Sequence, residues 1–177
     1  RSALSAIQSP YAHQETTPTF TKTFERVPGA RIQGSLPESA TDHDQVEFAP
    51  GDSVRVSVSL DPPNGREFTY EQASSLDENL AFEVTVPYAT VGYDEYGPAD
   101  GYTDAGVRAT GPYTVETGVK VDTEREMLVW FGADVDVREG QVVGAEAQTV
   151  GVEFEERTED LGFGGGDEGE AGTDTGE

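Results

Sequence analysis

The chain has 177 residues and no cysteine, and its 35 acidic residues against 11 basic ones give a formal net charge of -24. A chain of this length can bury one ordinary hydrophobic core, so we expect a single domain. The negative charge excludes nonspecific binding to nucleic acid or anionic lipid headgroups, and the absence of cysteine excludes disulfides, thiolate metal sites and cysteine nucleophiles.

The N-terminal segment, residues 1–19, mixes small and polar residues with proline. We interpret it as a linker or as the end of a preceding domain. The sequence has no apolar run of about 20 residues, the length that a transmembrane helix needs, and its first residues lack the apolar core of a signal peptide. We therefore expect no direct membrane insertion by this segment.

Short strands are predicted from residue 20 onward, because apolar and polar residues alternate with a period of two. The clearest example is residues 54–60, in which valine and leucine alternate with arginine and serine. Pro87 is expected at a strand end, since proline cannot donate to a sheet ladder. The predicted strands are residues 20–24, 31–36, 54–60, 67–72, 82–88, 106–110, 113–121, 127–137 and 142–154.

The spacing of these strands predicts the fold class, since no stretch shows the periodicity of a helix. Seven to nine strands at roughly 10-residue spacing are typical of an all-β, antiparallel β-sandwich of immunoglobulin-like or prealbumin-like type. We expect this domain to span residues 20–157. Residues 158–177 contain almost nothing apolar to bury, which predicts a disordered acidic, glycine-rich tail.

The tyrosine loop, residues 93–104, is the stretch that offers a ligand site. Its carboxylates could bind calcium through oxygen ligands. Its three tyrosines could instead stack on sugar rings or pack against a neighbouring domain or partner, or the loop could only fasten a corner of the sandwich while its acids face solvent. The calcium candidates are Asp94, Glu95, Asp100 and Asp104, and the domain-contact candidates are Tyr93, Tyr96 and Tyr102.

Other patterns give no catalytic or cofactor-binding residue. His13 and His43 lie in polar segments and, without cysteine, do not resemble a zinc site. The G-x-G-x-x-G pattern in the tail is followed by no helix that could bind a pyrophosphate. Asp134, Asp136 and Arg138 are expected on the solvent face of a strand, because an arginine stands where a calcium loop needs a third oxygen ligand.

The acidic residues are spread along the chain, and Lys22 and Lys120 are its only lysines. In concentrated salt the Debye length falls to about 3 Å near 1 M, so dispersed carboxylates scarcely repel one another. An acidic interaction patch would instead cluster its charges. The composition therefore indicates a halophilic protein.

Two blocks of the sequence carry a family resemblance: KTFERVPGARIQG at Lys22–Gly34, and FEVTVPYATVGYDEYGPADGYTDAGVRATGPY at Phe82–Tyr113. Both resemble the extracytoplasmic C-terminal region of haloarchaeal oligosaccharyltransferase, the AglB family of dolichyl-phosphooligosaccharide-protein glycotransferases. The likeness extends from Phe20 to Phe154 and is looser between residues 35 and 78.

The resemblance implies a non-catalytic accessory domain of an enzyme that transfers a lipid-linked glycan to asparagine in Asn-x-Ser/Thr acceptors. It implies an upstream catalytic and multi-span membrane domain in the same polypeptide, where magnesium or manganese is bound, and a position on the extracytoplasmic face of an archaeal membrane. Acceptor glycoproteins are further expected partners. The family's Trp-Trp-Asp-Tyr-Gly motif cannot be present, because Trp130 is the only tryptophan.

Because neither that motif nor the metal-bearing loops are present, no catalytic residue is carried over from the family. Trp130 and the adjacent Phe131 are then expected in the core. The alternative is a free-standing or tandem β-sandwich module with a binding or structural role on the surface of a halophile. Composition and strand spacing fit both classes, and only the two sequence blocks favour the transferase.

Overall fold

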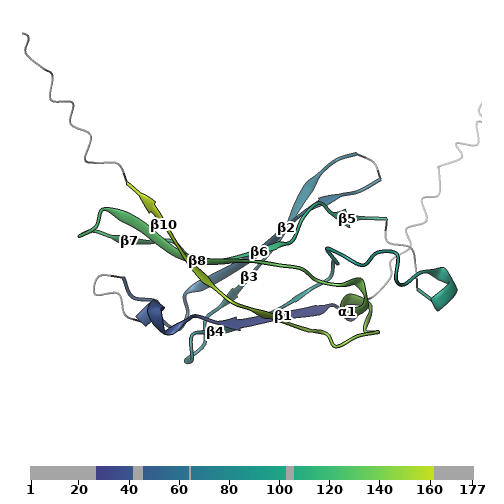
Figure 1. The fold of residues 1–177 in the computed structure, drawn as a ribbon, viewed down its shortest axis with the longest axis horizontal. Coiled ribbons are helices and arrows are strands. Elements are labelled where there is room, and N and C mark those ends of the chain that lie inside the picture. Colours follow the sequence, from purple (N-terminus) through teal and green to yellow (C-terminus); the bar gives the residue numbers. More distant parts are fainter. Residues whose placement is uncertain (1–26, 42–45, 64, 103–105, 162–177) are drawn as a thin grey trace, which may run out of the picture.

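The computed structural model describes residues 27–41, 46–63, 65–102 and 106–161, which fold into two β-sheets (Figure 1). The smaller sheet has the strand order β4 (Ala81–Val86), β1 (Ala30–Ser35), β9 (Thr149–Val152). The larger sheet has the order β10 (Glu155–Asp160), β8 (Met127–Val135), β6 (Tyr113–Thr117), β2 (Ser53–Asp61), β3 (Phe68–Ser75), with β5 (Arg108–Ala109) paired to β2 and β7 (Lys120–Asp122) paired to β8. Short helical segments connect the strands at η1 (Glu38–Thr41), η2 (Pro98–Asp100) and α1 (Glu139–Val143).

The two sheets form a sandwich, so the predicted fold class is confirmed. Figure 1 shows β1 and β4 in one layer and β8, β6 and β2 in the other. Buried side chains from both layers form one core cluster. Every pair of strands is antiparallel except β1 and β9, which run parallel.

The alternation predicted for residues 54–60 builds the central strand of the larger sheet. In β2 the apolar side chains are buried and every second residue turns outward. Each fully buried valine or leucine stabilises the fold by about 1.5–3 kcal/mol relative to an exposed one. Phe48 packs edge-on against Phe131 of β8, with ring centroids 5.2 Å apart. Strand β4 ends at Val86, directly before Pro87, as predicted.

The single strand predicted for residues 142–154 is wrong. This stretch contains the end of the short helix α1, a turn at Gly144 and strand β9, and it ends directly before β10. Gly144 has a φ of 83°, a left-handed conformation that glycine adopts without steric cost and that ends the helix. The chain then passes from the smaller sheet at Val152 to the larger one at Glu155.

A bulge interrupts the strand predicted for residues 113–121. β6 ends at Thr117 and β7 begins at Lys120, so Gly118 and Val119 lie outside the ladder. The backbone N–H of Phe131 donates instead to the Thr117 hydroxyl, at 3.0 Å. This hydroxyl replaces the missing ladder bond, so the buried N–H of Phe131 still has an acceptor at the bulge.

Two further expectations need correction. Trp130 is only half-buried on the outer face of β8, whereas Phe131 is fully buried, because neighbouring residues of a strand point to opposite faces. Strand β10 continues to Asp160, beyond residue 157 where the domain was expected to end. The predicted strand at 20–24 and most of the predicted tail lie outside the described residues. Within the described ranges, none of the helices is long and apolar enough to span a membrane.

Candidate functional site

Between the end of β4 and the tyrosine loop, Thr90 fastens the chain to the segment that follows β8. The backbone N–H of Thr90 donates to the carbonyl of Val137 at 2.7 Å, and the Val137 N–H donates to the Thr90 hydroxyl at 2.9 Å. That hydroxyl donates in turn to Asp136, at 3.0 Å. Sequence reasoning missed Thr90, since its buried hydroxyl is bonded to Asp136 and Val137, residues far along the chain.

Tyr93 ties the start of the loop to strand β5. Its hydroxyl donates to the carbonyl of Ala89 and accepts the backbone N–H of Ala109 at 2.7 Å. The Arg108 guanidinium lies 5.0 Å from the centre of its ring. Burial raises the pKa of Tyr93 above its ordinary value, although the Ala109 hydrogen bond and the Arg108 charge act in the opposite direction. Tyr93 therefore stays a neutral, bridging phenol.

Tyr96 ties the middle of the loop to α1. Its hydroxyl donates to the carboxylate of Glu146 at 3.2 Å, and its ring lies against Gly140. A Cβ atom at Gly140 would stand 2.7 Å from the Tyr96 ring, so only glycine allows this approach. Tyr102 completes the group, with its ring edge-on to Tyr96 at a centroid distance of 5.8 Å. The sandwich corner is thus fastened from within by its tyrosines.

The predicted calcium candidates are spread over the surface of the loop. Asp94 is exposed, Glu95 forms an ion pair with Arg138 at 3.5 Å, and Asp100 accepts the backbone N–H of Gly97 at 3.2 Å. Asp104 lies outside the described residues. Across the part of the chain that the structure describes, no three His, Cys, Asp or Glu side chains are grouped closely enough to hold a metal ion.

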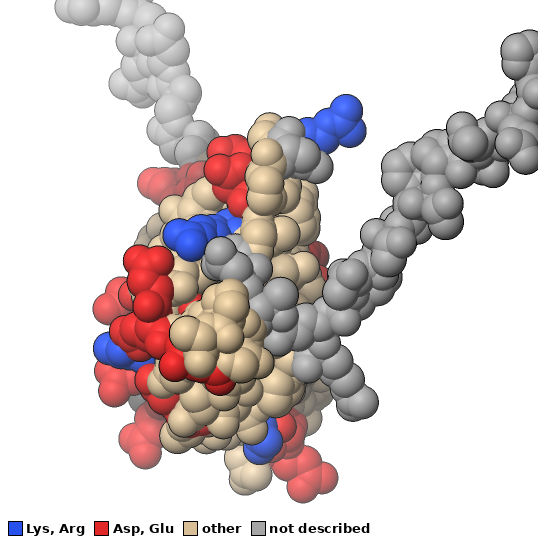
Figure 2. Space-filling view, turned by 90° about the vertical axis from the view of Figure 1, so that its right-hand side faces the viewer, with Lys and Arg blue, Asp and Glu red and all other residues tan. Residues whose placement is uncertain are grey.

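The end of the molecule that carries the loop is seen in Figure 2. Acidic side chains gather along one side of an uncharged surface there. The loop side chains that face solvent are mainly acidic or small, while the three tyrosines are half-buried. What the loop offers a neighbour is therefore a rigid, acidic rim around partly exposed aromatic rings.

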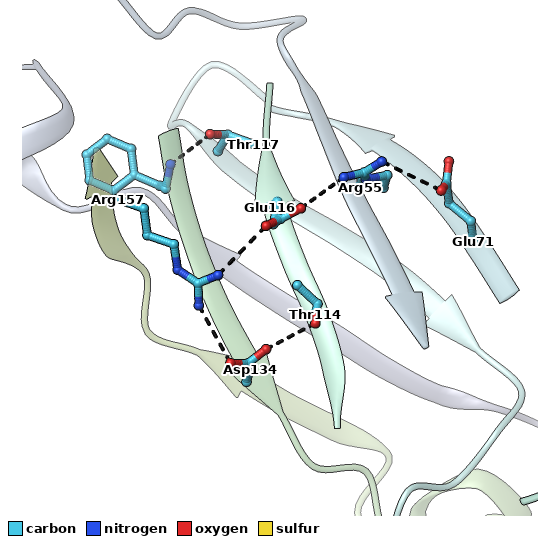
Figure 3. Close-up of polar contacts among 8 residues, drawn as sticks. Arg55, Glu71, Thr114, Glu116, Thr117, Asp134 and Arg157 are labelled. Carbon is cyan, nitrogen blue, oxygen red and sulfur yellow. Dashed lines mark hydrogen bonds and ion pairs between the residues drawn. The ribbon is translucent and has the colours of Figure 1, made fainter. Parts of the chain in front are cut away.

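A second polar cluster, which sequence reasoning missed, crosses the outer face of the larger sheet (Figure 3). Its acidic and basic members alternate along a chain of ion pairs: Glu71, Arg55, Glu116, Arg157 and Asp134. Arg55 binds Glu116 at 2.9 Å and Glu71 at 3.8 Å, while Arg157 reaches Glu116 at 3.7 Å and Asp134 at 3.6 Å. Asp134, Asp136 and Arg138 are exposed, as predicted.

Gly132 makes room for the arginine of this cluster. A Cβ atom there would lie 2.8 Å from the Arg157 side chain, which crosses β8 above the glycine. Strand β10 is thereby linked to β6 by an ion pair that passes over the strand between them. The arrangement is structural, since each of its three carboxylates is paired with at least one of the two arginines and none faces an apolar pocket.

An open groove of about 680 Å³ lies at the opposite end of the smaller sheet. Its polar side chains include Gln33, Ser35, Ser75, Asp77 and Glu83. The Asp77 carboxylate already accepts two backbone N–H groups of the turn that follows it, and Glu83 forms an ion pair with Arg31.

Comparison with known proteins gives the chain its family. Residues 45–147 match the model of the archaeal glycosylation protein B long peripheral domain. The chain is 38% identical over 153 residues to the dolichyl-monophosphooligosaccharide-protein glycotransferase AglB of Haloferax volcanii, covering 86% of this chain and 14% of that protein.

Solved structures similar to the chain include the Archaeoglobus fulgidus oligosaccharyltransferase. The complex with zinc and sulfate is 20% identical, with a TM-score of 0.45, and covers 72% of this chain and 12% of that one. The form tethered to an acceptor peptide with an NVT sequon is 21% identical, with a TM-score of 0.45, and covers 72% and 11%. The match of residues 45–147 spans more than half of the chain, which therefore belongs to the archaeal glycosylation protein B long peripheral domain family.

Proposed function

We propose that this chain is the non-catalytic accessory domain of an archaeal oligosaccharyltransferase, the enzyme that transfers a lipid-linked glycan to asparagine in Asn-x-Ser/Thr acceptors. The observation that carries the proposal is the family match over residues 45–147, supported by 38% identity to AglB of Haloferax volcanii. The chain spans 14% of the length of that relative, so catalysis is assigned to the remainder of the polypeptide.

The proposal places the divalent metal, magnesium or manganese, in the upstream catalytic and membrane domain, and this domain on the extracytoplasmic face of the membrane. It also names acceptor glycoproteins as partners of the whole enzyme. This chain has a single tryptophan, whereas the Trp-Trp-Asp-Tyr-Gly motif that reads the acceptor needs two tryptophans. This supports the assignment of acceptor recognition to another part of the polypeptide.

Within this function we assign the tyrosine loop to the contact with the catalytic part. Hydrogen bonds to their own chain hold the side chains of Tyr93 and Tyr96 in place before any partner arrives. A rigid surface loses little conformational entropy on docking, which favours a stable contact. The partly exposed ring edges of the tyrosines would supply its apolar area.

The contact is tested in a haloarchaeal cell that carries the complete enzyme. Asp94→Arg reverses an exposed charge of the loop and leaves the bonds of the three tyrosines intact, so we expect lower glycan occupancy of a reporter glycoprotein, measured by mass spectrometry. Glu153→Arg is the matched control, at the crossover between β9 and β10 on the opposite end of the smaller sheet. Equal occupancy in both variants, at equal enzyme abundance, would exclude the loop contact.

The parent enzyme is tested separately by reading the coding sequence upstream of Arg1. Many apolar spans of about 20 residues followed by the tryptophan motif support the transferase. A signal peptide or tandem β domains directly upstream would instead indicate a cell-surface module and overturn the assignment.

A further inference from the structure

An apolar patch lies at the projecting end of the larger sheet, far along the chain from the tyrosine loop. We call it the β7 patch, and its members are Val119, Val121, Leu128 and Trp130. Val119 and Val121 are 55% and 50% exposed, the two largest values among the exposed large hydrophobic side chains. Leu128 and Trp130 beside them are half-buried.

Strand pairing places these side chains on one face. Val121 lies opposite Leu128, and residues directly opposite in a ladder share a face of the sheet. Trp130 follows Leu128 by two positions in β8, so its side chain points the same way. Val119 lies in the bulge directly before β7. The patch therefore combines the single tryptophan of the chain with the two most exposed valines of the described residues.

The patch continues to an open sheet edge. Among the described residues, β7 pairs with β8 alone, and its other edge has no partner strand. Edge strands are commonly protected by being short, by bulges and by charged side chains that point inward. Strand β7 has only 3 residues and follows a bulge, and Lys120 turns inward, where its ammonium binds Asp52 at 2.8 Å and lies 5.6 Å from the centre of the Phe48 ring. The edge is therefore protected against strand addition, and the patch offers its outer face for a contact.

The charges around the patch indicate the chemistry of what covers it. Glu126 and Glu159 are exposed at its border, and Glu159 lies opposite Leu128 in the ladder. Two cations lie nearby, and both are paired: Arg157 with Glu116 and Asp134, and Arg125 of the β7–β8 turn with Asp122 at 3.7 Å. A partner that brings lysine or arginine to this border would meet carboxylates and no free cation.

We propose that the β7 patch docks an extended apolar segment, flanked by lysine or arginine, from another part of the same polypeptide. This segment lies across the outer face of the sheet and covers Val121, Leu128 and Trp130. The same polypeptide supplies the occupant because the relative of this domain is about seven times longer than the part that it shares with this chain, and a tethered segment is present at high effective concentration. The inference rests on the proposed function and adds a second contact, distinct from the tyrosine loop.

Single cysteines test the docking, because the chain itself has none. Val121→Cys and Phe68→Cys are made in the full-length enzyme, with any cysteines elsewhere replaced by serine. Val121 and Phe68 are 50% and 45% exposed in this domain, so Phe68→Cys on β3 is the matched control. Labelling with a maleimide is followed in molar KCl, and labelling after denaturation confirms that both thiols are reactive.

We expect Val121→Cys to react about tenfold more slowly than Phe68→Cys, since the reagent reaches a docked thiol only while the contact is open. Equal rates would overturn the proposal. Protection that disappears on dilution would assign the patch to a second copy of the chain, and protection lost on deleting residues 162–177 would assign it to that segment. Either result also overturns it. None of these outcomes changes the upstream coding sequence, which tests the proposed function.

Discussion

At the scale of single residues, the tyrosine loop is defined by bonds that its side chains make to their own chain. The Tyr93 hydroxyl bridges two backbone groups. At position 140 only glycine leaves room for the ring of Tyr96 to approach α1. Sequence reasoning could identify these tyrosines as the informative residues. It could not choose between fastening and contact, because the partners Ala109 and Glu146 come from strands and turns whose positions depend on the fold.

A glycine pair in the smaller sheet gives a sharp prediction at the same scale. A Cβ atom at Gly34 in β1 would lie 2.9 Å from the Val152 carbonyl oxygen and 3.2 Å from the Phe82 ring, whereas nothing lies within 4 Å at Gly151 in β9. Gly34→Ala should therefore lower the free energy of unfolding by about 1–3 kcal/mol, the usual effect of overpacking. Gly151→Ala should leave it unchanged or raise it by up to about 1 kcal/mol.

Urea denaturation in molar KCl compares the two variants in one background. Both replace a strand glycine by alanine, so their effects on the unfolded chain cancel in the comparison. A Gly34→Ala variant as stable as Gly151→Ala would show that β1 and β9 separate easily.

At the scale of elements, the alternation predicted at residues 54–60 and 82–88 is found in strands β2 and β4. Strands β2 and β4 each bury one face, so their valines alternate with polar residues and the strands can be predicted from the sequence. The elements between residues 139 and 160 cannot be predicted in this way. The apolar residues of this region serve a helix and two strands in different sheets, and the turn at Gly144 separates them.

The ion pair between Asp52 and Lys120 ties the loop before β2 to β7 and makes the stability depend on pH. Burial alone would raise the pKa of Asp52, but its hydrogen bonds with Lys120 and with the N–H of Ala49 outweigh this and lower it. A lowered pKa means that the stabilisation is present above the unfolded value of about 3.9 and is lost as the pH falls through the folded value.

Lys120→Met should therefore reduce stability by about 1 kcal/mol near neutral pH, a modest effect because the pair is partly exposed. The difference from the wild-type chain should shrink as the pH falls below about 4, where Asp52 becomes protonated. Urea titrations at a series of pH values measure it. Arg31→Met is the control, since its pair with Glu83 is about half exposed and contributes little. A difference that persists undiminished at pH ~3 would contradict this account.

At the scale of the whole molecule, the charge of -24 opposes folding unless salt screens it. In the described part of the chain, Arg55 and Arg157 each bind two carboxylates. The 11 basic side chains are too few to balance the 35 acidic ones, so counterions from the solvent must balance the remaining charge. Bringing these carboxylates together in the folded sandwich raises their mutual repulsion, and this cost falls as the Debye length shortens.

We therefore expect the urea midpoint to rise as KCl is increased from about 0.1 M to about 1 M, over which the Debye length falls from about 10 Å to about 3 Å. Salt can also strengthen apolar burial, so the slope alone does not identify repulsion as its cause. A variant with Glu47→Gln, Glu67→Gln and Glu153→Gln separates the two effects, because these exposed substitutions remove charge and leave the core unchanged. Its midpoint should be higher at low salt and converge with that of the wild-type chain in molar KCl. Parallel salt dependences in the two chains would instead assign the effect to apolar burial, and the acidic surface would then have no part in stabilising this domain in brine.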